Sequence, residues 1–115
     1  MDRKRKAEID LQREISFIIN TKAKDPRIGF VTVTGAKLSV DYKWIDVFVS
    51  IMGSESDREQ SLKGLEKSKG FIKKNLLKRM KLRSVPDIRF IFDESINKGI
   101  KISEILEELN KKGQD

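Results

Sequence analysis

The residue types best suited to chemistry in this chain are the lysines and arginines between residues 67 and 83. These seventeen positions hold eight basic residues and no acidic one, where the average composition of the chain would give about four and about three. Solvated helix faces usually mix both signs of charge, so the alternative of an ordinary solvated face fits this run less well than a phosphate-binding face. The eight basic residues are Lys67, Lys69, Lys73, Lys74, Lys78, Arg79, Lys81 and Arg83.

Residue types that catalysis commonly uses are absent. The chain has no Cys and no His, which excludes thiolate metal sites, a cysteine nucleophile and a histidine general base. A magnesium cluster could be imagined from Asp41, Asp46, Asp93 and Glu94, but Asp41 fits a turn and Asp93 fits a helix start. The chain also has no glycine-rich phosphate cradle. We therefore expect no catalytic residue, no metal or other cofactor and no small-molecule substrate.

The overall charge points to a polyanionic partner. In 115 residues, 25 Lys and Arg stand against 18 Asp and Glu, a net charge of +7, and a small basic domain of this kind usually meets nucleic acid or an anionic membrane. No apolar run approaches the roughly 18 residues of a membrane span, and acids close to the N-terminus argue against a signal or transit peptide. We expect one cytoplasmic, monomeric domain over residues 1–115, with frayed ends at 1–6 and 111–115 and no membrane partner.

The hydrophobic pattern predicts the elements that position these charges. Apolar spacing indicates a helix over about residues 3–21. Alternation then indicates two strands that pair as a hairpin, with a bulge at Gly35 and a turn at Asp41. A long helix over about 57–82, capped by Ser54 or Ser56, a third strand after Pro86 and a final amphipathic helix reaching residue 109 complete the chain. This order predicts an α+β fold: a three-stranded sheet with helices on one face.

The long helix cannot be straight. As one helix it would place Lys69 in the apolar stripe between Leu65 and Ile72, where burial would cost several kcal/mol. A break at Ser68-Lys69-Gly70 turns Lys69 outward, exposes backbone N–H groups and leaves both apolar faces buried. Gly70 is the residue expected to absorb the break.

The second half of this helix carries a ridge of like charges. Lys74, Lys78 and Lys81 recur at i, i+4 and i+7, where they repel one another unless an external anion neutralises them. For base stacking, the pattern leaves three exposed aromatic candidates, Tyr42, Trp44 and Phe48, and the interpretation of Trp44 as sheet-edge packing is favoured.

The chain resembles the ribosome-binding factor A family over about residues 5–93. The most specific segment is Asp25-Pro26-Arg27-Ile28-Gly29-Phe30-Val31-Thr32-Val33-Thr34, and shorter segments in the same order support it, among them Val47-Phe48-Val49-Ser50, Gly70-Phe71-Ile72-Lys73 and Leu82-Arg83-Ser84-Val85-Pro86. The resemblance implies a KH-like fold of type II topology without the G-x-x-G loop of ordinary KH domains. No two glycines here are three apart. The family's Ala-x-Gly kink corresponds to Ser68-Lys69-Gly70, with Ser in place of Ala.

The resemblance also implies a function. Members of the family are non-catalytic assembly factors that bind the free 30S subunit and 16S rRNA, assist late maturation and 5′-end processing of 16S rRNA, and support growth in the cold. Carried over to this chain, the kink and the second half-helix would lie against rRNA and hold its backbone through Lys69, Lys73, Lys74, Lys78 and Arg79. The full set of RNA-binding residues that we expect is Lys67, Ser68, Lys69, Gly70, Lys73, Lys74, Lys78, Arg79, Lys81 and Arg83. Two alternatives stay open: a metal-dependent RNA-processing enzyme and a basic DNA-binding module.

Overall fold

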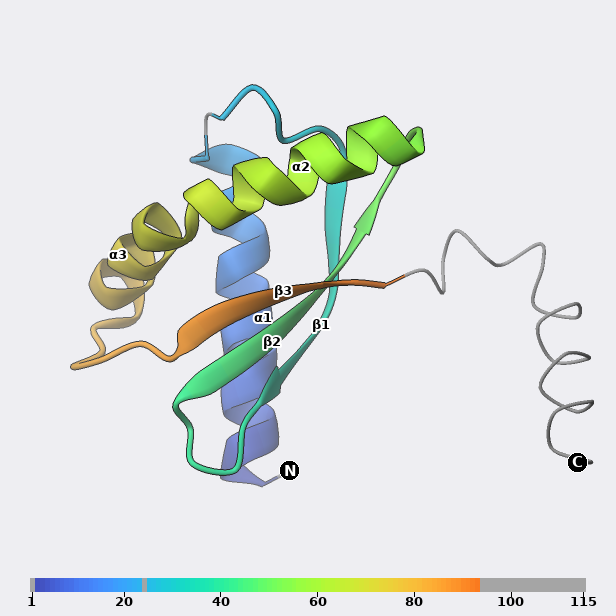
Figure 1. The fold of residues 1–115 in the computed structure, drawn as a ribbon. Helices are drawn as coiled ribbons and strands as arrows, with labels where there is room; N and C mark the ends of the chain where they lie inside the picture. The colour runs from blue at the N-terminus through green and yellow to red at the C-terminus, as the bar shows by residue number, and fades with distance from the viewer. Residues whose placement is uncertain (1, 24, 94–115) are drawn as a thin grey trace, which may run out of the picture.

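The computed structural model describes residues 2–23 and 25–93, which form a three-stranded sheet and three helices (Figure 1). In chain order the elements are α1 (Arg3–Thr21), β1 (Val31–Leu38), β2 (Trp44–Ile51), α2 (Glu55–Lys67), α3 (Lys69–Met80) and β3 (Asp87–Phe92). This is the predicted α+β fold. The final helix expected before residue 109, and the frayed end expected at 111–115, lie outside the described residues.

The sheet has the order β1-β2-β3. The first two strands form the predicted antiparallel hairpin, and β3 pairs in parallel with β2 after the crossover through α2 and α3. Val33 pairs with Val49 and Gly35 with Phe48, so the register shifts by one residue between them. This bulge keeps both halves of β1 turned toward the core, as the sequence predicts.

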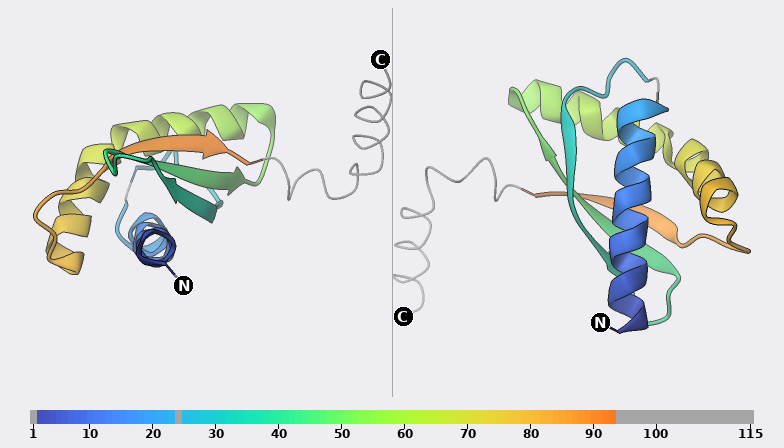
Figure 2. Two further views of the ribbon diagram at one scale, coloured as in Figure 1. Left: turned by 90° about the horizontal axis from the view of Figure 1, so that it is seen from below. Right: turned by 180° about the vertical axis from the view of Figure 1, so that it is seen from behind.

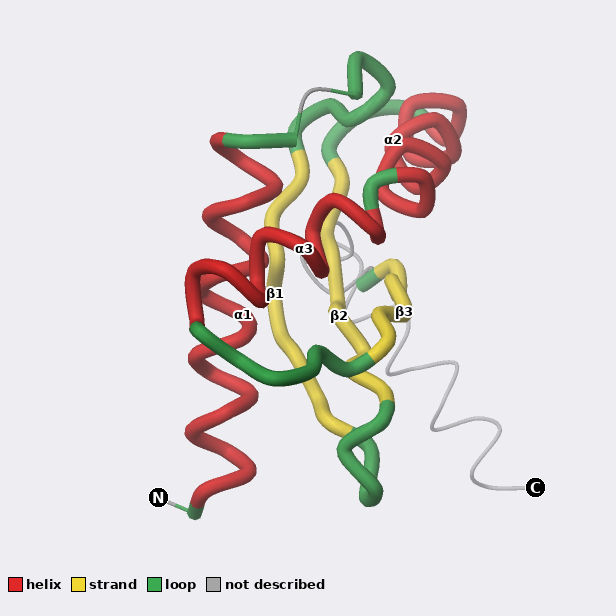
Figure 3. The backbone as a smooth tube through the Cα atoms, turned by 90° about the vertical axis from the view of Figure 1, so that its left-hand side faces the viewer, coloured by secondary structure: helices red, strands yellow, loops and turns green. Residues whose placement is uncertain are grey.

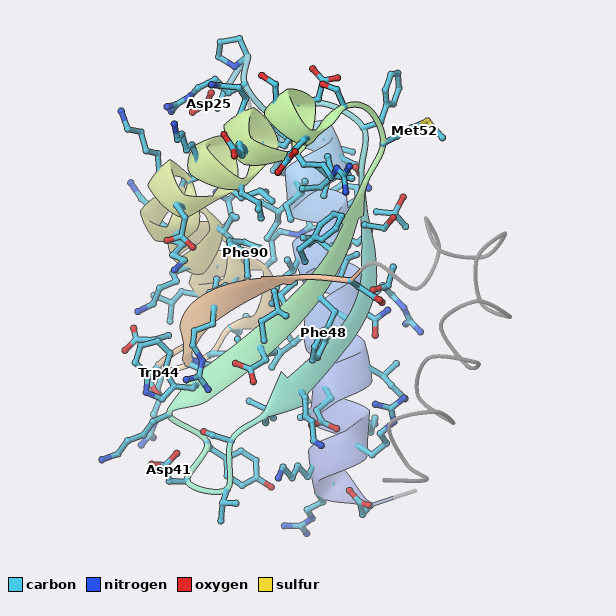
Figure 4. All side chains as sticks on the ribbon, turned by 45° about the vertical axis from the view of Figure 1, so that its right-hand side comes forward. Asp25, Asp41, Trp44, Phe48, Met52 and Phe90 are labelled. Atoms are coloured by element: carbon cyan, nitrogen blue, oxygen red, sulfur yellow. The ribbon has the colours of Figure 1, made fainter. Side chains whose placement is uncertain are left out.

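The core lies between the sheet and the helices. Ile45, Val47, Val49 and Ile51 of β2 are fully buried, because alternate residues of a strand point to one face. The three helices all lie on that side of the sheet, as the views in Figures 2 and 3 show. Within the described part of the chain, the second face is left uncovered. Trp44 and Phe48 lie on it, with α1 behind the sheet (Figure 4).

α1 is held at its start by a side-chain cap and along its length by a buried carboxylate. The amide of Arg5 donates to Asp2 Oδ1 at 2.7 Å, and residues 3–6, expected within a frayed end, form the first turn. Glu8 is buried, and its Oε2 accepts a 2.7 Å hydrogen bond from the amide of Leu38. This bond ties α1 to the end of β1. None of the described helices combines the length and apolar character that a membrane crossing needs.

The break in the long helix is confirmed, and it falls at Ser68. α2 starts at the predicted cap, Ser54, and ends at Lys67. Ser68 has φ −87° and ψ −2°, its amide donates to the carbonyls of Gly64 and Leu65, and α3 then leaves in a new direction (Figure 1). Any L-residue can adopt these angles. Gly70 lies within α3 and is not among the described residues with positive φ. The expectation that Gly70 absorbs the break is therefore wrong.

Candidate nucleic-acid interface

One face of α3 is buried in the core, and the helix presents predicted basic residues outside that face. Ile72 and Leu76 are fully buried, and Figure 3 shows α3 lying across the helix-covered side of the sheet. Five of the predicted cations have no carboxylate oxygen within 4.0 Å among residues 2–23 and 25–93. We call these five the open cations: Lys67, Lys74, Lys78, Lys81 and Arg83.

Two of the other predicted cations are held by carboxylates on the side of α3 that faces β3. Lys69 Nζ lies 2.7 Å from Glu66 Oε2 and 6.0 Å from the centre of the Phe90 ring, and its side chain is only 28% exposed. The break moves Lys69 out of the core stripe, as expected, but onto the Phe90 ring, where Glu66 neutralises it. Lys73 Nζ similarly pairs with Asp87 Oδ1 at 2.6 Å.

The third paired cation, Arg79, connects α3 to α1. Its Nε donates to Glu14 Oε2 at 2.6 Å, and its guanidinium lies 4.2 Å from the centre of the Phe17 ring. A charged hydrogen bond combined with stacking on an aromatic ring fixes the relative position of two helices. Arg79 therefore acts as a structural anchor in this arrangement, although the sequence suggested an RNA contact.

The start of α3 adds backbone groups to the open cations. Ser68 makes no side-chain cap there, and the first turn contains no acidic residue. Amides at an uncapped helix start carry partial positive charge and attract anions. Gly70 is exposed, and a Cβ built on it meets nothing within 4 Å. The space in front of this turn is therefore open to a ligand.

A cleft of about 650 Å³ lies beside the break. It is formed by the end of α1, the following loop and one flank of α3, and its lining residues are Thr21, Lys22, Ala23, Asp25, Ser68, Phe71 and Asn75. Phe71 is 44% exposed. The expectation that only Tyr42, Trp44 and Phe48 offer exposed aromatic surface is therefore wrong. The signal in the sequence was an aromatic residue three positions before Lys74, on the same helix.

The loop that forms one wall of the cleft is held by Asp25. Its carboxylate accepts hydrogen bonds from the Arg27 amide at 2.9 Å, from Nε at 3.0 Å and from Nη2 at 2.6 Å. These bonds to Arg27 lower the pKa of Asp25 to about 2. Ser61 of α2 accepts from the Gly29 amide and donates to the Arg27 carbonyl. The most specific segment of the sequence thus fastens this loop to α2.

The carboxylates considered for a magnesium cluster have other partners. Asp46 Oδ1 accepts from Arg89 Nε at 2.7 Å, and the same guanidinium stacks on Trp44 at 5.0 Å. Asp41 accepts from the Ser39 hydroxyl and the Lys43 amide within the hairpin turn. No group of three or more potential metal ligands gathers within the described residues. Glu94 lies outside them.

The fold and the site together define a KH-like domain in which a helix-break-helix replaces the G-x-x-G loop. The model of the ribosome-binding factor A family matches residues 3–106, and the chain belongs to this family. It is 52% identical over 101 residues to the ribosome-binding factor A of Macrococcus caseolyticus, covering 88% of this chain and 89% of that protein.

Solved structures agree with this assignment. The crystal structure of ribosome-binding factor A from Thermus thermophilus has a TM-score of 0.69 at 27% identity, covering 77% of this chain and 93% of that one. A homology model of the Thermus thermophilus protein, fitted into a cryo-electron microscopy map of a 30S–RbfA complex, has a TM-score of 0.64 at 25% identity. That match covers 76% of this chain and 91% of the other.

Proposed function

We propose that this chain is a non-catalytic assembly factor that binds the free 30S ribosomal subunit through 16S rRNA. In this proposal it assists late maturation and 5′-end processing of the rRNA, including in the cold, and acts as a cytoplasmic monomer. Membership of the family and the 30S complex of the Thermus thermophilus relative support it. The observation that carries the RNA-binding part is the series of open cations from Lys67 to Arg83 along α3, whose uncapped start adds backbone amides at one end.

The binding surface would work through phosphate contacts. Lys74 and Lys78 lie one turn apart on the ridge of α3, so together they can follow a nucleic-acid backbone. Lys67 stands before the break, and Lys81 and Arg83 continue the charge beyond the helix. Ser68 and Gly70 leave the first turn accessible to a phosphate oxygen. Lys69, Lys73 and Arg79 contribute less, because each would first have to leave a carboxylate.

Binding of this kind can act on assembly without catalysis. A protein that binds one arrangement of immature rRNA better than another shifts the RNA toward that arrangement. The factor would be released once the RNA changes to the form it binds weakly.

The test is the distribution of the tagged protein across ribosomal fractions. We expect it with free 30S subunits and not with 70S ribosomes. The variant Lys74→Glu/Lys78→Glu should lose 30S co-sedimentation with an unchanged circular dichroism spectrum. Lys37→Glu/Lys43→Glu is the matched control, since it changes the net charge equally at exposed positions away from α3. Unchanged co-sedimentation of the first variant would refute the site.

Two rival functions have separate tests. Incubation of the purified protein with precursor rRNA and magnesium should give no cleavage beyond the control without protein, and cleavage would favour a metal-dependent enzyme. When 30S subunits and duplex DNA compete for the protein at physiological salt, the 30S subunits should displace the DNA from it. Stronger retention of DNA would favour a DNA-binding module.

A further inference from the structure

We propose that the cleft beside the break binds one unpaired nucleobase, stacked on Phe71, and that it favours bases with an exocyclic amino group. This inference rests on the proposed function, because it specifies what the RNA places between the phosphates that α3 holds. It adds a base-reading element to a surface otherwise made of phosphate contacts.

The position of Phe71 supports a base in the cleft. Its ring is 44% exposed and lines a cleft of about 650 Å³, a size within the usual range of ligand sites. Lys74 follows it by three residues on α3, and residues at this spacing are neighbours on a helical surface. Exposed aromatic rings flanked by cations are the usual platforms for single-stranded bases.

The polar atoms of the cleft suit a base better than a phosphate. Asp25 is ionised at neutral pH, because its bonds to Arg27 hold its pKa far below its usual range. The Asp25 carboxylate is paired with Arg27 and has only acceptor oxygens, which give a phosphate no hydrogen bond, so we place the phosphates outside the cleft, along α3. A base with N–H donors can use such an oxygen. Lys22 is exposed and adds one cation to the cleft lining.

The same atoms favour hydrogen-bond donors on the base. The Thr21 hydroxyl donates to the Phe17 carbonyl at 2.6 Å, and the Asn75 side-chain amide donates to the Phe71 carbonyl at 2.9 Å. These two side chains therefore have acceptor oxygens left to offer, as does the carboxylate of Asp25. Adenine and cytosine present an exocyclic amino group, which uracil lacks.

The test uses single-stranded RNA oligonucleotides carrying 2-aminopurine, whose fluorescence is quenched on stacking. The wild-type protein should quench the probe, and Phe71→Leu should remove the quench and weaken binding at least fivefold. The log–log salt dependence should stay unchanged in this variant, because no phosphate contact is lost. Phe71→Tyr, which keeps an aromatic ring, should restore the quench. Phe30→Leu is the matched control, since Phe30 is 82% exposed and does not line the cleft.

The outcomes separate this inference from the proposed function. RNA binding with a normal salt dependence, but with no quench and no effect of Phe71→Leu, would overturn the base site and leave the proposed function intact. No RNA binding at all would overturn both. A Phe71→Leu variant that loses 30S subunits but keeps naked RNA would assign the cleft to a ribosomal protein and refute a base. Equal affinity for oligo(A), oligo(C) and oligo(U) would refute the preference for amino-bearing bases.

Discussion

Neutralising two open cations should change the salt dependence of RNA binding by a calculable amount. Each phosphate contact contributes about −0.7 to −0.9 to the slope of log K against log salt. Five open cations therefore give a slope of about −3.5 to −4.5 for the wild-type protein. The double variant Lys74→Gln/Lys78→Gln should reduce this slope by about 1.4 to 1.8. All eight predicted cations together would instead give about −5.6 to −7.2.

The matched control is the double variant Lys69→Gln/Lys73→Gln. It removes the same charge from the same helix, but both lysines already lie within 2.7 Å of carboxylates. Its slope should therefore stay close to that of the wild-type protein. The assay is equilibrium binding to 30S subunits at several salt concentrations. A wild-type slope near −6, or an equal loss of slope in both double variants, would refute the division into open and paired cations.

Four further substitutions test the surroundings of the site. Gly70→Ala should raise the free energy of unfolding by up to about 1 kcal/mol, because a helical Ala replaces Gly in open space, yet weaken 30S binding; unaltered binding would show that nothing approaches this turn. Gly64→Ala should lower the free energy of unfolding by about 1–3 kcal/mol in urea titrations, since its Cβ would come within 2.7 Å of Ile28. Asp25→Asn should be less stable than the wild type at neutral pH. Because folding lowers the pKa of Asp25 to about 2, this difference should close as the pH falls from about 4 toward 2, and a pH-independent difference would contradict the Arg27 contact. Ser54→Ala should cost about 1 kcal/mol of thermal stability by removing the capping box, and an unchanged melting temperature would contradict that role.

The sequence was sufficient to predict the helices and strands between residues 3 and 92 and the break in the long helix, because these depend on local patterns. Four alternating apolar residues from Ile45 to Ile51 can be buried together only on one face of a strand. The break follows from one conflict, a lysine in the apolar stripe of a helix. Which residue bends is not determined by that conflict. Ser68 takes the bend, since its backbone angles need no glycine.

The sequence could not show which cations of the site are paired with carboxylates, since this pairing depends on contacts between distant segments. No acid occurs between residues 67 and 83. In the fold, however, Glu14 of α1 pairs with Arg79, and Asp87 of β3 pairs with Lys73. These pairs separate a structural set of cations from an open set. The cleft was hidden for the same reason, because its walls come from three segments of the chain.

The most direct test of the central claim is a crosslinking experiment that identifies the RNA next to Lys74 on α3. A photo-reactive amino acid placed at position 74 should crosslink to 16S rRNA in a complex with 30S subunits. The same group at position 37, an exposed site on β1, should not. Crosslinks to 16S rRNA from position 37 but none from position 74 would contradict the account.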